Sequence, residues 1–182
     1  MNADIVGTLA AAAGLAWASG VQLYAMLYVA GLLGRLGYLH LPDVLIVLQH
    51  PFVLWASGLV FCVEFLADKI PTLDSLWDGI HTFIRIPAGA VLAGAALGDY
   101  NPAVIVAAGI FGGTLAAGTH AAKAGSRALI NTSPEPVSNV IASLSEDAQV
   151  FGGLFAALHH PVAFLAMLTV FVLLLIWILP RL

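Results

Sequence analysis

Apolar residues run along this chain in stretches long enough to cross a lipid bilayer. A membrane-spanning helix needs about 20 consecutive, mostly apolar residues, and this measure predicts spans at about 5–33, 51–70, 84–97, 102–130 and 161–179. The first stretch is long and is interrupted by Gly14 and by Ser19-Gly20, so we expect it to kink or break there. The third is short, and we expect it to continue the helix that precedes it.

Two further segments mix polar and apolar residues with the period of a helix. Residues 72–86 place four polar side chains in one stripe about 60° wide, opposite an apolar side; they are Asp74, Asp78, His81 and Arg85. Residues 137–158 repeat the design, with a polar face of Asn139, Ser143 and Glu146. Such helices either lie at the membrane interface or re-enter the membrane with the polar stripe toward a cavity.

The composition changes the choice of protein class. Of the 182 residues, 61% are hydrophobic and 9% are charged, whereas a soluble domain is about 25% charged. This excludes an ordinary cytosolic enzyme and a disordered chain, and six Lys and Arg residues are too few for a nucleic-acid-binding arm. We therefore predict an all-α, polytopic transmembrane helical bundle that forms a single membrane domain, with membrane lipid as a partner and no nucleic acid.

Two pairs of similar segments indicate an internal repeat. LQHPFVLWASGLVF at 48–61 resembles LHHPVAFLAMLTVF at 158–171, and GTLAA occurs both at 7–11 and at 113–117. On this interpretation repeat one covers about 5–72, a linking span about 73–100, and repeat two about 102–182. Three crossings would separate the copies and invert the second, as in many transporters. The alternative is chance similarity between helices rich in Ala and Leu.

Eleven of the 16 charged residues fall into two windows. The windows contain Glu64, Asp68, Lys69, Asp74, Asp78 and Arg85, and then Lys123, Arg127, Glu135, Glu146 and Asp147. Five spans would put both windows on one side of the membrane. That side carries most of the Lys and Arg residues, so the positive-inside rule places it, together with the N-terminus, in the cytoplasm.

One face of the span at 102–130 carries small residues first and polar or cationic residues later. This face consists of Gly109, Gly113, Ala116, His120, Lys123, Arg127 and Asn131. Small residues allow close helix contact in membranes, and ionisable groups at membrane depth need partners. We therefore expect Glu64 or Asp68 to contact Lys123 or Arg127. These charges could instead form a purely structural ion-pair network, or could lie at the span ends with their charged groups reaching water.

Metal and catalytic motifs are absent from the sequence. His81 and His120 are conceivable metal ligands, but no HxxxH, HExxH or CxxC spacing accompanies them. Nor is there a GxSxG, P-loop or GxGxxG arrangement. We predict no catalytic residues, no metal and no cofactor.

The two charged windows resemble those of a bacterial membrane family that is catalogued as domain of unknown function 4126. The segments are EFLADKIPTLDSLWDGIHTFIR followed by PAGA, and HAAKAGSRALINTSPEPVSN followed by SLSED. The similarity extends over essentially the whole chain. It implies a small polytopic inner-membrane protein, and it adds Pro71, Trp77, Ser133 and Pro134 to the polar motif positions. One departure is Ile86, because the family pattern has Arg directly before Pro.

Three functions fit these patterns. The first is a small transporter or channel for a small solute that is anionic or proton-coupled. In this case Glu64, Asp68 or His81 would carry the proton. The helix start at Asn131–Pro136 would help to hold an anion. The second is an enzyme acting on a lipid head group, with His81, Asp78 and Glu146 as acid/base or metal groups. The third is a non-catalytic scaffold. We expect a transporter, as a homodimer in the bacterial inner membrane.

The residues that we predict to line the path of a substrate or ion come from both charged windows and both amphipathic segments. They are Glu64, Asp68, Lys69, Asp74, Asp78, His81, Arg85, His120, Lys123, Arg127, Asn131, Asn139, Ser143, Glu146 and Asp147.

Overall fold

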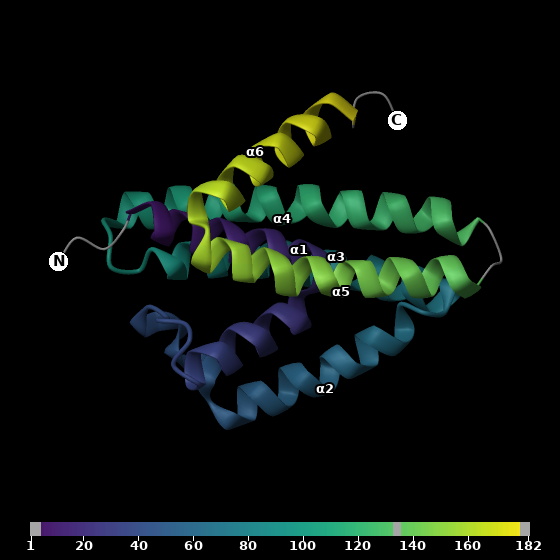
Figure 1. Ribbon diagram of the computed structural model, residues 1–182, viewed down its shortest axis with the longest axis horizontal. Coiled ribbons are helices and arrows are strands. Elements are labelled where there is room, and N and C mark those ends of the chain that lie inside the picture. The colour runs from purple at the N-terminus through teal and green to yellow at the C-terminus, as the bar shows by residue number, and fades with distance from the viewer. Residues whose placement is uncertain (1–4, 133–135, 179–182) are drawn as a thin grey trace.

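The described parts of the computed structural model, residues 5–132 and 136–178, are helical throughout apart from short turns (Figure 1). The elements are α1 (Ile5–Arg35), the 3-10 helix η1 (Asp43–Gln49), α2 (Pro51–Ala67), α3 (Pro71–Ala96), α4 (Pro102–Asn131), α5 (Pro136–His159) and α6 (Pro161–Ile178). Helices α1, α3, α4 and α6 are long and apolar enough to span a membrane, and the bent pair of η1 and α2 adds a fifth candidate. The chain is therefore an all-α, multi-pass membrane protein, as predicted.

Proline marks the start of every helix after η1. Its missing N–H costs nothing at the first helical position, where that group would have no partner within the helix. The residue before the proline adds a cap in two cases. The Asn101 side chain accepts a hydrogen bond from the N–H of Ala103 at 2.8 Å, and His50 Nδ1 accepts one from Phe52 at 3.2 Å.

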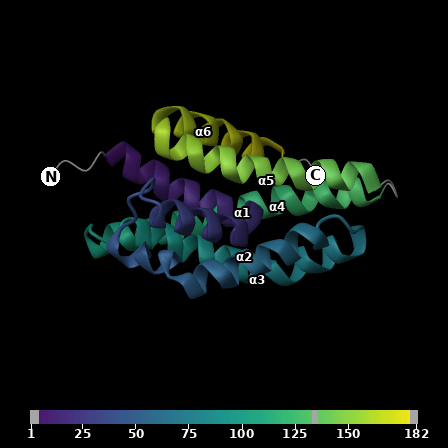
Figure 2. The same cartoon turned by 60° about the horizontal axis from the view of Figure 1, so that its bottom comes forward.

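The amphipathic segment at 72–86 and the short span after it form one helix. Helix α3 is 26 residues long and passes through Pro87 without ending, so the expected continuation is confirmed. Helix α5, which contains the second amphipathic segment, runs along the long axis of the bundle and packs mainly against α1 (Figures 1 and 2). It does not lie across one end of the bundle, as an interfacial helix would. It is not among the helices apolar enough to span a membrane.

Helix α1 breaks at Gln22, where φ is −147° and ψ is 87°. We expected a kink or break at Gly14 or Ser19-Gly20, so the break lies slightly further along the chain. The two halves form a V with both ends at the same end of the bundle (Figure 1). In agreement with this, Gly7 and Thr8 line the same cavity of about 550 Å³ as Leu33 and Tyr38. The two ends of the predicted span at 5–33 therefore lie close together in the structure, although α1 as a whole is long and apolar enough to span a membrane.

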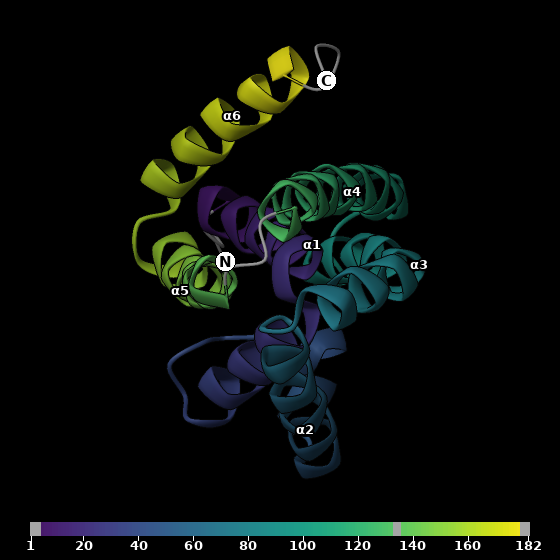
Figure 3. The ribbon, with the colours of Figure 1, turned by 90° about the vertical axis from the view of Figure 1, so that its right-hand side faces the viewer.

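The break is stabilised by contacts at the tip of the V. Gln22 is fully buried there, and its side-chain amide donates to Asp68 Oδ2 at 2.6 Å. Gly20 lets α1 approach α4 closely, since a Cβ atom at this position would lie 2.5 Å from the Ala116 carbonyl oxygen. Viewed along the long axis, α1 lies between α3, α4 and α5, while α6 projects away from the bundle (Figure 3).

The directions of the helices differ from the predicted inverted repeat. An inversion requires the matching segments at 48–61 and 158–171 to run in opposite directions. Helices α2 and α6 instead both start at the end of the bundle where α1 begins and run toward the other end (Figure 1). The turn between α2 and α3 lies at that other end of the bundle (Figure 1). These directions arise because α1 turns back on itself.

Small residues bring α3 and α4 into close contact. A Cβ atom added at Gly89 would lie 2.5 Å from Ala116 Cβ and 2.7 Å from Ser19 Oγ. Gly79, on the same helix, is exposed, and no atom of another residue lies within 4 Å of a Cβ atom added there. Close approach of helices through small residues is a main source of stability in membrane bundles.

Gly89→Ala is expected to destabilise the bundle, because the added methyl group forces α3 away from α4 and α1. The loss should be about 1–3 kcal/mol, as for other overpacked cores. Gly79→Ala is the matched control and should stabilise the helix by about 0.5–1 kcal/mol. Thermal unfolding in detergent measures both, and equal stability of the two variants would contradict the packing described here.

The V shape of α1 predicts which positions label from the same side of a membrane. In a Cys62→Ser background, single cysteines from Ile5→Cys and Tyr38→Cys should react with a membrane-impermeant thiol reagent from one side. Ser75→Cys, near the start of α3, should react from the opposite side. Labelling of positions 5 and 38 from opposite sides would mean that α1 crosses the membrane.

Candidate functional site

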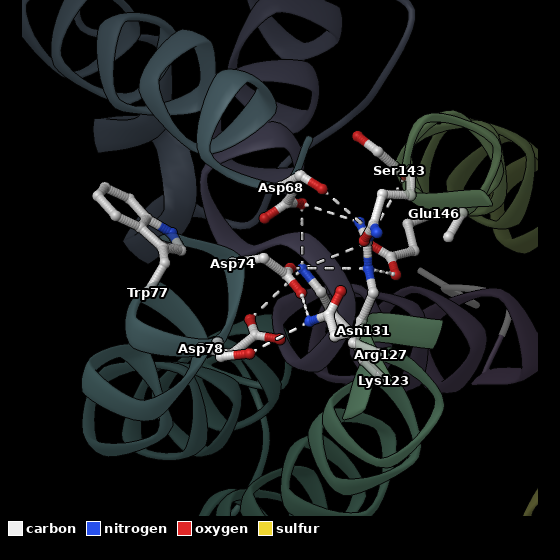
Figure 4. Close-up of polar contacts among 12 residues, drawn as sticks. Asp68, Asp74, Trp77, Asp78, Lys123, Arg127, Asn131, Ser143 and Glu146 are labelled. Atoms are coloured by element: carbon white, nitrogen blue, oxygen red, sulfur yellow. Dashed lines mark hydrogen bonds and ion pairs between the residues drawn. The ribbon is translucent and has the colours of Figure 1, made fainter. Parts of the chain in front are cut away.

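Eight ionisable side chains lie close together inside the bundle and form what we call the buried charge cluster, and six of them are labelled in Figure 4. Its members are linked by ion pairs, and each is at most 7% exposed. They are Glu64, Asp68, Asp74, Asp78, Arg85, Lys123, Arg127 and Glu146. The cluster joins the end of α2 and the turn after it to α3, α4 and α5. Both predicted amphipathic stripes therefore converge on one enclosed site.

Lys123 of α4 lies among three carboxylates. Its Nζ is 3.3 Å from Asp68, 3.4 Å from Glu146 and 3.5 Å from Asp78. These partners come from the turn after α2, from α5 and from α3. The predicted contact between Glu64 or Asp68 and Lys123 or Arg127 is thus confirmed. One ammonium group among three buried carboxylates is also incompletely balanced in charge.

Arg127, one turn further along α4, binds Glu146 through two parallel hydrogen bonds. Its Nε is 2.7 Å from Oε1 and its Nη2 is 3.0 Å from Oε2, the bidentate geometry that makes Arg–carboxylate pairs strong. Nη1 donates to the carbonyl oxygens of Asp68 at 3.1 Å and Asn139 at 3.2 Å. Asp74 lies 3.7 Å from Nε. Arg127 therefore fastens α5 and the turn after α2 to α4.

Arg85 of α3 forms the inner end of the cluster. It is fully buried and pairs with Glu64 and with Asp78, the latter at 2.8 Å. The indole N–H of Trp77 donates to the same Glu64 oxygen at 3.3 Å. Arg85 also donates to His120 Nδ1 at 3.1 Å. Every polar group of the α3 stripe is therefore directed into the bundle.

The hydrogen bonds of the two histidines are each satisfied by one ring tautomer. Because Arg85 donates to His120 Nδ1, the proton of this ring lies on Nε2, which donates to Thr82 Oγ1 at 2.6 Å. His81 donates from Nδ1 to the Trp77 carbonyl at 2.8 Å and accepts at Nε2 from the Tyr24 hydroxyl at 3.1 Å. Both nitrogens of each ring are thus engaged. Within residues 5–132 and 136–178, no three His, Cys, Asp or Glu side chains are placed to hold a metal ion.

Asp147 and Lys69 adjoin the cluster on the side facing α2. Asp147 is 7% exposed, and neither of its side-chain oxygens has a hydrogen-bond partner. Lys69 Nζ donates to the Phe65 carbonyl at 2.7 Å and to Ser143 Oγ at 3.3 Å, and lies 3.0 Å from the centre of the Phe65 ring. Burial raises the pKa of the Asp147 carboxyl to about 6, with Asp68 adding to the rise. Burial also lowers the pKa of the Lys69 ammonium group.

The region holds more carboxylates than cations. Six acids, the five of the cluster and Asp147, face four bases, the three of the cluster and Lys69, which leaves two formal negative charges in excess. Unbalanced charge in a low-dielectric interior is costly. Buried oxygens of Glu64, Asp68 and Asp78 also have no hydrogen-bond partner. The arrangement can therefore accept protons more readily than an anion.

A groove of about 520 Å³ reaches the cluster between α4 and α5. Its polar lining comes from Thr119, Lys123, Ser126, Ser138, Ser145, Glu146 and Gln149. The cluster is therefore in contact with a space outside the helix core through Lys123 and Glu146. The groove does not extend to the histidines or to Arg85.

The structure brings most of the predicted path residues together. Asn131 donates to Asp74 at 2.9 Å, Asn139 contacts Arg127, and Ser143 contacts Lys69. His81 lies at the edge, against Tyr24 and Trp77. Ser133, Pro134 and Glu135, which are half of the proposed anion site at 131–136, lie outside the described residues. Sequence analysis missed Gln22, although an amide within an apolar span is a recognisable signal of a buried polar contact.

Lys123→Ala should leave three buried carboxylates without their shared cation and cost about 3–5 kcal/mol. The yield of folded protein and its thermal stability in detergent measure the loss. Asp68→Asn in the same chain should restore part of it, because one of the unpaired charges is then removed. Arg35→Ala, at an exposed position, is the control and should change stability by less than about 0.5 kcal/mol. Equal effects of the two alanine variants would contradict the predicted role of Lys123 in the cluster.

Comparison with known proteins identifies the family. No curated protein and no solved structure matches this chain. The family described as "Domain of unknown function (DUF4126)" matches residues 9–181, which include the whole buried charge cluster together with Lys69 and Asp147. The chain therefore belongs to the DUF4126 family.

Proposed function

We propose that the protein is a small membrane transporter or channel that conducts protons through the buried charge cluster. The observation that carries this proposal is the excess of buried carboxylates over cations, at a site that a groove reaches from outside the bundle. Ionisable groups at membrane depth are costly to bury and typically mark ion or proton pathways. Here they are concentrated in one connected site.

The break in α1 supports the same function. Transporters place their binding sites where a helix is discontinuous, because unwound backbone and buried polar groups can then face the substrate. In this chain the tip of the V presents Gln22 to Asp68 at 2.6 Å, inside the cluster. A broken helix and a buried charge cluster thus lie in direct contact.

The charge arrangement favours protons over an anionic solute. Arg85, Lys123 and Arg127 are each paired with at least two carboxylates, so an anion would have to displace them. An enzyme acting on lipid head groups also has less support, since both nitrogens of His81 are engaged in hydrogen bonds. The bacterial inner membrane, the homodimer and the side on which each terminus lies stay predictions from the sequence.

The protein reconstituted in liposomes should collapse an imposed pH gradient faster than protein-free liposomes, as followed by a trapped pH-sensitive dye with the membrane potential clamped. Glu146→Gln should lower the rate by about tenfold or more, because it removes the carboxylate at which the groove meets the cluster. Ser145→Phe should do the same by filling the groove without changing any charge.

Two controls use exposed positions away from the site. Asp99→Asn removes a carboxylate from the turn between α3 and α4, and Thr114→Phe adds a ring to an exposed position of α4. Both should keep the wild-type rate. Wild-type flux equal to that of protein-free liposomes would refute proton conduction and favour the scaffold.

A further inference from the structure

We infer that Asp147 is the carboxyl group that takes up and releases the proton, with Lys69 as its mobile counter-ion. The transport role of this pair rests on the proposed function, whereas its protonation does not. The sequence pointed to Glu64, Asp68 or His81 as the proton carrier. The structure argues against these three residues as the proton carrier, because each already has a cation or a hydrogen-bond partner.

Asp147 differs from the other acids of the site in having no cation bound to it. Each carboxylate of the buried charge cluster has an Arg or Lys nitrogen within 3.7 Å. Asp147 has no such ion pair among the described residues, and its two oxygens are buried without a hydrogen-bond partner. A buried carboxyl group in this situation is favoured in its neutral form.

The surrounding charges act in the same direction. Asp68 and Glu64 face Asp147 from α2 and the turn after it, and Glu146 precedes it on α5. Lys69 is the one cation among the charges that act most strongly on Asp147. Burial and the three carboxylates together raise the pKa of Asp147 to about 6, against the opposing effect of Lys69. The group can therefore change its charge near neutral pH.

Lys69 is placed to respond to that change. Its Nζ is held by Ser143 Oγ at 3.3 Å and by the Phe65 carbonyl at 2.7 Å. Ser143 and Asp147 are four residues apart on α5, so their side chains share one face about 5–6 Å apart. A shift of the ammonium group by one helical turn would bring it from the hydroxyl of Ser143 to the carboxylate of Asp147.

The proton step is simple. Uptake forms an O–H bond on one oxygen of the Asp147 carboxylate, with the proton transferred from a hydronium ion that becomes water. Release returns the proton to water and leaves a carboxylate, which Lys69 then pairs. Protonation of Asp147 thus decides whether α5 is tied to the turn between α2 and α3 through Ser143 or through Asp147.

Infrared difference titration of the reconstituted protein tests the assignment without requiring transport. A protonated carboxyl band should disappear with a midpoint near pH 6. Asp147→Asn should abolish this band, and the control Asp99→Asn should retain it. Lys69→Gln should move the midpoint upward by about one unit, because a cation that opposes protonation is removed.

Stability gives a second readout of the same group. Native Asp147 holds its proton to higher pH than the unfolded chain does, so the free energy of unfolding should fall as the pH rises from about 4 to 6. Asp147→Asn should remove this fall. A band that titrates normally in Asp147→Asn, or a midpoint unmoved in Lys69→Gln, would overturn the inference. Loss of the band with wild-type proton flux would keep the assignment and refute its role in transport.

Discussion

Charged side chains that leave water for the interior of a helical bundle lose their hydration, and this cost constrains the whole fold. The chain reduces this cost by placing its buried charges together, where three basic side chains form ion pairs with five acidic ones. The pairs cross between helices, so that α4 is bound to α5 through Arg127 and to the turn after α2 through Lys123. Because a buried ion pair barely repays its own desolvation, the close packing of small residues between α3 and α4 has to supply stability.

The V shape of α1 helps to meet the same constraint. The break places the amide of Gln22 against Asp68, which gives a buried carboxylate another donor. The break also makes α1 approach α4 closely at Gly20. Polar contact and close packing at the tip are therefore parts of one arrangement.

Local patterns in the sequence predicted the features that depend on helix period. The stripe from Asp74 to Arg85, the start of α4 at Pro102 and the contact between Asp68 and Lys123 were all predictable, because periodicity and the cost of burial determine them. The direction of each helix was not, since it depends on whether α1 crosses or turns back. That depends on contacts between residues far apart in sequence, such as Gln22 with Asp68. The sequence likewise placed Asp147 in a charged window without indicating that it would have no cation partner.

Helix α5 presents its two adjacent acids to different surroundings. Consecutive residues of a helix point about 100° apart, so Glu146 faces Arg127 and the groove while Asp147 faces Lys69 and α2. A charge change at Asp147 alters what ties α5 to the turn after α2, and Arg127 contacts the carbonyl of Asp68 in that turn. The groove side and the α2 side of the site are therefore connected through one rigid helix and one arginine. A proton bound on one side can in this way alter the ion pairs that border the groove on the other.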